Sequence, residues 1–152
     1  FLPNHQNLLI THPLFGPLSY NNGNQGKNQL TLVITESVGK KAKIVEEYCA
    51  KKLKLRALHM SDQEHDKRMA EIHALTFFIA RGLTKLNLHS EPFMTASFQS
   101  LLDLVALDAS QTEALFETVQ NGNPFASQER QQFLEVLGQV NSSLGRPNNI
   151  VE

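Results

Sequence analysis

The pattern of hydrophobic and polar positions divides the chain in two. Residues 7 to 60 alternate strand and helix signals, whereas from Ser61 onward every periodic signal is helical. In the first part, Leu30 to Thr35 is a β-branched, apolar run typical of a strand covered on both faces. Lys40 to Leu53 then repeats apolar residues at helical spacing, and Leu55 to Met60 predicts another strand. This order predicts a β-α-β unit with a parallel sheet.

A histidine follows the first apolar run of the chain. Asn7 to Ile10 predicts the end of a short buried strand, and the Pro- and Gly-containing residues 13 to 17 predict a turn after it. Thr11 and His12 are therefore expected where a strand emerges into a loop. Reactive side chains of α/β folds lie beyond the strand ends in this way. The alternative is a surface histidine in a turn.

The second part of the chain predicts a helical domain. Ser61 to Glu64 has the sequence of a capping box, so a long helix is expected to begin there. Residues 74 to 80 are apolar all round, which places this helix in the middle of a core. Further helices are expected at Pro92 to Leu107, Ser110 to Gln120 and Ser127 to Ser142. An apolar central helix also needs more cover than one subunit's short helices provide, which favours a symmetric dimer.

Charge and composition exclude several classes of partner. The 152 residues hold 14 basic and 15 acidic side chains, so the near-zero net charge gives no electrostatic case for nucleic acid or an anionic membrane. No apolar run approaches the roughly 20 residues that a membrane span requires. Cys49 is the one cysteine, which excludes an intrachain disulfide and suits a reducing compartment. We therefore expect a soluble cytoplasmic protein, for which small neutral or acidic partners remain open.

His5, His59 and His89 have no metal-ligand spacing with carboxylates or with Cys49, so no metal site is expected.

The chain begins with Phe1 rather than Met, and its first strand needs neighbours to pair with. We therefore expect it to be a fragment of a longer protein.

Five short motifs occur in a definite order. HPLFGP follows the first apolar strand, LVITES lies in the next strand, DQEHDKRMAEIHALTFF opens the long helix, and FQSLLDLV and QNGNPFA follow. With these motifs, the chain resembles the prephenate and arogenate dehydrogenase family over most of its length. The resemblance implies a mainly α fold: residues 1–60 as the second half of a Rossmann-like, dinucleotide-binding α/β domain, and residues 61–152 as an all-helical domain. That second domain, similar to the C-terminal domain of 6-phosphogluconate dehydrogenase, would bind substrate and form a homodimer.

The same resemblance implies a reaction and a catalytic residue. The family oxidises the ring C4 alcohol of prephenate or arogenate, with loss of CO2 and aromatisation of the ring, in tyrosine biosynthesis. His12 matches the histidine of the family's HP-[ML]-F-G motif. A neutral imidazole there would accept a hydrogen bond from the C4 hydroxyl.

The cofactor implied is NAD or NADP. Thr11, Pro13, Thr35 and Ser37 are candidates to contact it, with capping of the next helix as the simpler explanation for Thr35 and Ser37. No G-x-G-x-x-G follows a strand, since the loop at residues 23–26 lacks the third glycine. The chain on its own is therefore expected to bind nicotinamide cofactor poorly and to be inactive.

Candidate substrate contacts lie in the helical part. Arg81 is the best candidate to hold a substrate carboxylate, with an end-of-helix arginine reaching to water as the alternative. Thr76 precedes Phe77, where many family members have a second histidine, and His73 is a candidate to replace it or else a core or surface residue. Gln99 stands near the position of a family arginine.

The His65-Asp66 pair matches an HD pair of the family at the start of the long helix. We expect it to tie the two domains together rather than to take part in catalysis. Two other functions stay open beside the dehydrogenase. One is a dimerisation module whose chemistry is lost, and the other is a related oxidoreductase with a different substrate.

Overall fold

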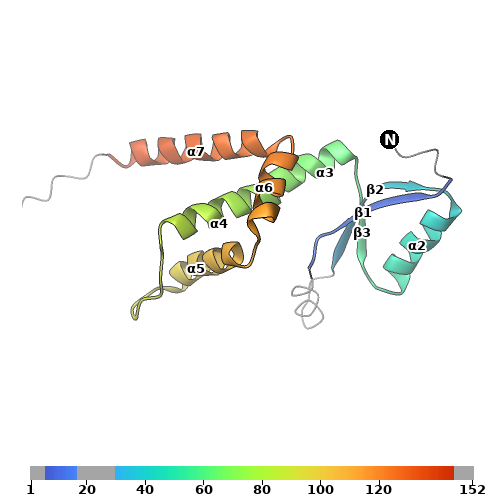
Figure 1. Cartoon of the computed structure of the whole chain (residues 1–152), viewed down its shortest axis with the longest axis horizontal. Coiled ribbons are helices and arrows are strands. Elements are labelled where there is room, and N and C mark those ends of the chain that lie inside the picture. The colour runs from blue at the N-terminus through green and yellow to red at the C-terminus, as the bar shows by residue number, and fades with distance from the viewer. Residues whose placement is uncertain (1–5, 17–29, 146–152) are drawn as a thin grey trace, which may run out of the picture. The chain divides into compact units, whose positions relative to one another are not determined.

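A computed structural model describes residues 6–16 and 30–145 of the chain (Figure 1). The chain divides into two compact units, Phe1–His65 and Asp66–Glu152. The first holds a three-stranded sheet and one helix, and the second is helical. The prediction of a mainly α fold with a partial Rossmann-like segment is thus confirmed. Within the described ranges, no helix combines the length and apolar character that crossing a membrane requires.

The sheet has the strand order β1-β2-β3, with β1 at Leu8–Pro13, β2 at Thr31–Val38 and β3 at Arg56–His59. Strands β2 and β3 are parallel and are connected through α2, Lys40–Lys51, as the β-α-β prediction required. The antiparallel pairing of β1 with β2 differs from the wholly parallel sheet expected.

The first strand also extends further than expected. His12 lies within β1, paired with Val33, and not in a loop beyond the strand end. Proline at position 13 is tolerated because β1 is an edge strand of this sheet, where a residue without an N–H group does not remove a hydrogen bond between strands. Pairing even continues past it, since the Leu14 N–H donates to the Thr31 carbonyl at 2.9 Å.

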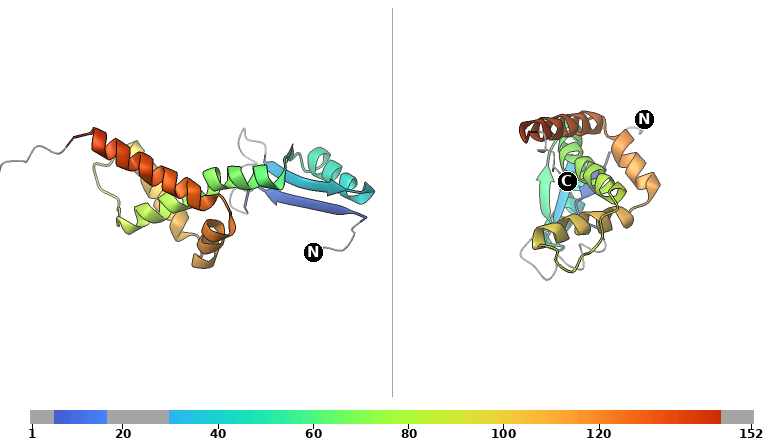
Figure 2. Two further views of the ribbon diagram at one scale, coloured as in Figure 1. Left: turned by 90° about the horizontal axis from the view of Figure 1, so that it is seen from above. Right: turned by 90° about the vertical axis from the view of Figure 1, so that its left-hand side faces the viewer.

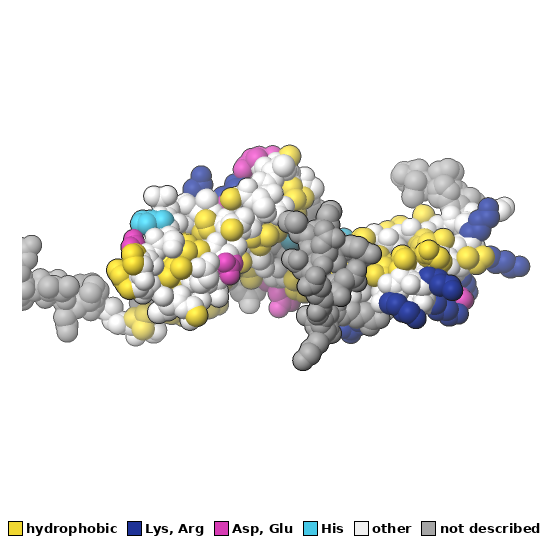
Figure 3. Space-filling view, turned by 90° about the horizontal axis from the view of Figure 1, so that it is seen from below, with side chains coloured by type: hydrophobic (Ala, Val, Ile, Leu, Met, Phe, Trp, Pro, Cys, Tyr) yellow, Lys and Arg dark blue, Asp and Glu magenta, His cyan; other side chains and the backbone are white. Residues whose placement is uncertain are grey.

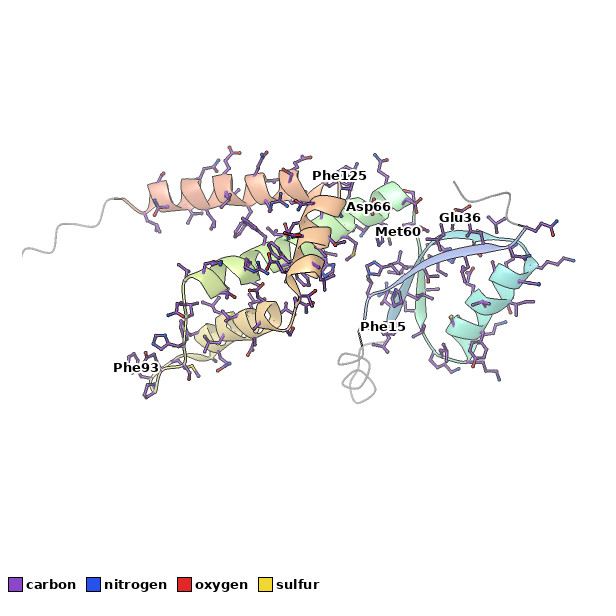
Figure 4. All side chains as sticks on the ribbon, in the orientation of Figure 1. Phe15, Glu36, Met60, Asp66, Phe93 and Phe125 are labelled. Carbon is purple, nitrogen blue, oxygen red and sulfur yellow. The ribbon has the colours of Figure 1, made fainter. Side chains whose placement is uncertain are left out.

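The two faces of the sheet have different neighbours. Leu32, Ile34 and Leu55 form the core cluster, against which Cys49 of α2 packs. Side chains alternate along a strand, so His12 and its partner Val33 lie on the other face. Glu36 lies on the same face as His12, because it pairs with Ile10, which is two residues before His12 in β1. Figure 4 shows Glu36 on the side of β2 away from α2.

A β-bulge interrupts the pairing of β1 with β2. Ile10 pairs with Glu36, whereas the next residue, Thr11, pairs with Ile34, so Thr35 is the extra residue of β2. A bulge of this kind changes the direction of the side chains beyond it. Ser37, three residues before the first turn of α2, consequently lines a crevice beside that helix.

The N-terminus of α2 is built on the segment that precedes β1. Gly39, at φ 88°, precedes the helix, and Asn7 Oδ1 accepts a hydrogen bond from the Lys41 N–H at 2.9 Å. A Cβ on Gly39 would lie 2.0 Å from the Gln6 carbonyl oxygen. The expectation that Thr35 or Ser37 caps this helix is wrong, because Gly39 at its N-terminus provides no side-chain cap and neither hydroxyl has a hydrogen-bond partner among the residues that the structure describes.

The long helix consists of three consecutive segments, α3 at Asp62–Met69, η1 at Ala70–Ala74 and α4 at Leu75–Lys85. Its N-terminus has the expected cap, since Ser61 Oγ accepts a hydrogen bond from the Glu64 N–H at 3.2 Å. The π-helical turn η1 was not predicted from the sequence.

The remaining helices are α5 at Ala96–Ala109, α6 at Glu113–Gly122 and α7 at Ala126–Ser143. Helices α4 and α5 lie side by side in both views (Figures 1 and 2). The long helix contributes Ala70, Ala74, Phe77 and Ala80 to the core. The other residues from 74 to 80 are only half-buried, and Ile72 is exposed.

Side chains of the QNGNPFA motif hold the long helix at two points. Asn123 Nδ2 donates to the Asp66 carbonyl at 2.7 Å, and Gln120 Nε2 donates to the Ala74 carbonyl at 2.7 Å. Arg130 fixes the other end of the Gln120 amide, since its Nη1 donates to Oε1 at 2.7 Å. Figure 4 shows Phe125, from the same motif, close to Asp66. The motif therefore fastens α3 and η1 to the junction of α6 and α7.

Substitution Gly39→Ala is expected to lower the free energy of unfolding by about 1–3 kcal/mol, because the new Cβ clashes with backbone and the positive φ is strained. Gly138→Ala is the matched control. It lies inside α7 with open space around it, so alanine is expected to be neutral or to stabilise by up to about 1 kcal/mol. Urea unfolding of both variants measures the difference, and equal stabilities would contradict this account of Gly39.

Candidate active site

The candidate active site is a pair of histidines in the strand-containing unit. His12 Nδ1 lies 2.8 Å from His65 Nε2, a hydrogen-bond distance. The two rings meet edge to face, with centroids 5.1 Å apart and an interplanar angle of 68°. Strand pairing with β2 holds His12, and His65 lies in the first turns of α3, where its N–H donates to the Ser61 carbonyl at 2.9 Å.

The surroundings of His12 favour its neutral form. Burial lowers the pKa of His12, and the neighbouring His65 lowers it further. A neutral imidazole has one N–H donor and one acceptor nitrogen. Within the described residues, Nδ1 contacts His65, and no hydrogen bond is made by Nε2. The second nitrogen of His12 is therefore available to a ligand.

The four candidate cofactor contacts are not gathered around His12. Thr11 and Pro13 alternate with His12 along β1, so their side chains lie on the opposite face of the sheet. The hydroxyls of Thr35 and Ser37 are buried and have no partner in the described part of the chain. Ser37 is one of the residues that line a crevice of about 410 Å³. The other residues that line this crevice are Lys43, Glu46, Glu47 and His59.

A nicotinamide cofactor fits these residues only in part. Two buried hydroxyls without partners suit a carboxamide or a ribose, both of which donate and accept hydrogen bonds. A glycine-rich turn at a helix N-terminus, which holds the pyrophosphate in dinucleotide-binding folds, is not found in residues 6–16 and 30–145. The glycines of residues 23–26 lie outside the described residues.

Arg81 is engaged by two carboxylates of its own chain. Its Nε lies 2.9 Å from Asp108 Oδ1 and its Nη1 lies 2.9 Å from Glu113 Oε2. Hydrogen bonds to Glu113 and Asp108 raise the pKa of Arg81. The guanidinium also stacks 4.0 Å from the centre of the Phe116 ring. It therefore joins α4 to α5 and α6 and does not simply extend from a helix end into water.

The other candidate substrate contacts each have a separate partner. His73 lies edge-on to Phe77, with ring centroids 4.3 Å apart, and Phe77 itself is part of the core. The Thr76 hydroxyl donates to a backbone carbonyl one turn earlier in the helix. Gln99 Nε2 donates to Asp103 Oδ1 at 2.9 Å on the exposed side of α5. These contacts do not by themselves gather the three side chains into one site.

The contact between His65 and His12 was missed at the level of sequence. From the sequence, the HD pair predicts a tie between domains and not a contact with His12. The two histidines lie 53 residues apart, so no local spacing connects them. The parts of the chain that the structure describes contain no group of three or more His, Cys, Asp or Glu side chains suited to a metal ion.

The lowered pKa of His12 makes stability depend on pH. The folded state holds a proton on His12 less readily than the unfolded state, so stability is fully present above the usual pKa of 6.5 and falls as the pH drops below it. One proton limits the slope to about 1.4 kcal/mol per pH unit.

Urea unfolding between pH 5 and 8 is expected to show this loss, and His12→Gln is expected to flatten the curve. NMR titration of His12 in the folded chain gives its pKa directly. A value at or above 6.5 would contradict the assignment.

Comparison with known proteins identifies relatives. No protein-family model matches the chain. The chain is 31% identical over 132 residues to arogenate dehydrogenase 2, a chloroplastic protein of Arabidopsis thaliana, covering 83% of this chain and 36% of that protein. It is 32% identical over 144 residues to the chloroplastic arogenate dehydrogenase 1 of the same plant, covering 87% of this chain and 21% of the relative.

The chain thus spans about a third of the length of one relative and about a fifth of the other. The similarity nevertheless extends over most of the chain. It agrees with the order of the five motifs along the sequence. On these grounds, the chain belongs to the prephenate and arogenate dehydrogenase family.

Proposed function

We propose that this chain is part of an NAD(P)-dependent dehydrogenase that converts arogenate or prephenate to its aromatic product by oxidative decarboxylation. The names of the two relatives favour arogenate. The observation that carries the proposal is the half-buried His12 with its lowered pKa, whose Nδ1 is already hydrogen-bonded and whose Nε2 makes no hydrogen bond within residues 6–16 and 30–145. Together with the family membership, this is the arrangement that an alcohol oxidation requires.

His12 has a defined part in this reaction. Its Nε2 accepts a hydrogen bond from the ring C4 hydroxyl and takes the proton as that oxygen becomes more acidic. The lowered pKa of His12 keeps the ring unprotonated at neutral pH before the reaction, so that a lone pair is present to accept the hydroxyl proton. NAD or NADP, when bound, accepts the hydride from C4. Thr35 and Ser37 are the described residues that would contact its polar groups.

We also propose that Arg81 binds a substrate carboxylate, which takes the place of one of the two carboxylates that Arg81 contacts in its own chain. Its partner Asp108 is nearly buried, with 7% of the side chain exposed, whereas the side chain of Glu113 is 66% exposed. The Glu113 carboxylate is therefore the one that a substrate carboxylate would replace, while Asp108 keeps the guanidinium in place. His73, Thr76 and Gln99 remain proposed as further substrate contacts on the helical unit.

The first test is turnover by the longest natural form of this chain. Reduction of NAD and NADP is measured with arogenate and with prephenate, beside a His12→Asn variant. The wild type is expected to turn over at least one substrate. The variant is expected to lose about 100-fold or more in kcat, as for the removal of an acid–base group. His89→Asn is the matched control, since His89 is exposed, and it is expected to retain full activity.

The opposite result would favour another function. A folded protein that binds nicotinamide cofactor but turns over neither substrate would point to a related oxidoreductase with a different substrate. A folded dimer without cofactor binding would point to a dimerisation module.

We also propose that the protein is a homodimer through its helical unit. Hydrophobic side chains lie at the surface of this unit on the face shown in Figure 3. Every residue from 134 to 145, along the second half of α7 and just beyond its end, is exposed. Three apolar residues of this helix and its apolar C-cap residue repeat at spacings of four, three and four, which is the pattern of helices that pack along a seam. They are Phe133, Leu137, Val140 and Leu144.

Charge on this seam is expected to prevent dimer formation. Leu137→Glu places a carboxylate in the middle of the apolar stripe, and burying it without a partner is costly. Gln131→Glu, on the opposite side of α7, is the matched control. Sedimentation at micromolar concentration is expected to give a dimer for the wild type and the control and a monomer for Leu137→Glu. A monomeric wild type would refute the dimer.

A further inference from the structure

The contact between His12 and His65 requires a proton. At 2.8 Å, Nδ1 of His12 and Nε2 of His65 are too close to carry two opposed lone pairs, so one of these nitrogens is protonated and donates to the other. The geometry alone permits either direction. Donation by His12 and donation by His65 leave Nε2 of His12 in different protonation states.

The direction decides what His12 offers to a ligand. If His65 donates, a neutral His12 carries its own proton on Nε2 and presents a donor. If His12 donates from Nδ1, its Nε2 carries a lone pair and presents an acceptor. A hydroxyl that is about to lose its proton requires the acceptor. The proposed reaction is therefore compatible with only one of the two arrangements.

We propose that His65 is a positioning residue that accepts the Nδ1–H of His12 and thereby keeps the Nε2 lone pair of His12 directed toward the substrate hydroxyl. The catalytic consequence rests on the proposed function, whereas the tautomer itself does not. During the reaction, the hydroxyl proton moves to Nε2 of His12 and the O–H bond breaks. The resulting imidazolium then donates a charge-assisted hydrogen bond to His65.

Both rings are held by regular backbone structure. His12 is fixed in β1 by the β1–β2 pairing, and its side chain leaves the face of the sheet away from the core cluster. His65 is fixed by the capped first turn of α3, where Ser61 accepts hydrogen bonds from two backbone N–H groups through its hydroxyl and its carbonyl. The edge-to-face arrangement then leaves Nδ1 of His12 facing Nε2 of His65. This fixed geometry suits a positioning role.

Ring ¹⁵N spectra of the chain at pH 8 test the tautomer without any substrate. The expected result is a His12 ring with its proton on Nδ1 and a bare Nε2. His65→Leu removes the acceptor and is expected to populate the Nε2–H form of His12. His65→Gln provides a carboxamide oxygen and is expected to keep the proton on Nδ1. His89→Leu is the matched control, with no change at His12.

A wild-type His12 protonated on Nε2 would overturn the proposal. So would a His65→Leu variant that folds and leaves the His12 tautomer unchanged, because His65 would then be merely structural. The His65→Gln spectra keep the test decisive if His65→Leu fails to fold, since a shift of the proton to Nε2 there would also count against the proposal.

Turnover by the longest natural form separates this inference from the proposed function. His65→Leu is expected to lower kcat by about tenfold or more with little change in KM, and His65→Gln is expected to recover most of the loss. Absence of turnover with either substrate would refute the proposed function while leaving the tautomer result intact. Turnover that depends on His12 but not on His65 would refute only the positioning role.

Discussion

The antiparallel pairing of β1 with β2 is the constraint on which the strand-containing unit depends. It fixes His12 opposite Val33, and it creates the bulge that leaves Thr35 as an extra residue. The segment just before β1 also forms the N-terminal cap of α2 through Asn7. The position of the histidine, the direction of Ser37 and the start of the helix therefore all follow from one strand pair.

The helical unit depends on polar contacts as much as on its small core. Asp108 and Gln120 are its buried polar residues in the described ranges, and each has a partner that compensates for its burial. Arg81 neutralises Asp108, and Arg130 completes the contacts of Gln120. Since the buried apolar residues here are mostly alanines, these contacts contribute much of the precision with which the helices meet.

The sequence allowed the elements to be predicted better than their contacts. The β-α-β unit, the cap at Ser61 and the helices of the second unit follow from local periodicity and cap residues. The direction of β1 and the bulge at Thr35 do not, because they depend on pairing between segments far apart in the chain. The same applies to His65, whose contact with His12 is tertiary, and to Arg81, whose two carboxylate partners lie on other helices.

The π-helical turn η1 affects how this chain tolerates change in length. A π turn accommodates one more residue than an α turn, and one residue of an α-helix corresponds to about 100° of rotation about its axis. Deleting a single residue between Ala70 and Ala74 would therefore leave an unbroken α-helix in which α4 keeps nearly its present orientation relative to α3, whereas the same deletion inside α3 would turn every residue beyond it by about 100°. Arg81 and Phe77 would keep their neighbours after the first deletion and would face different ones after the second. Alignments that place a one-residue gap in this turn should therefore be interpreted as loss of the π turn, with the contacts beyond it retained.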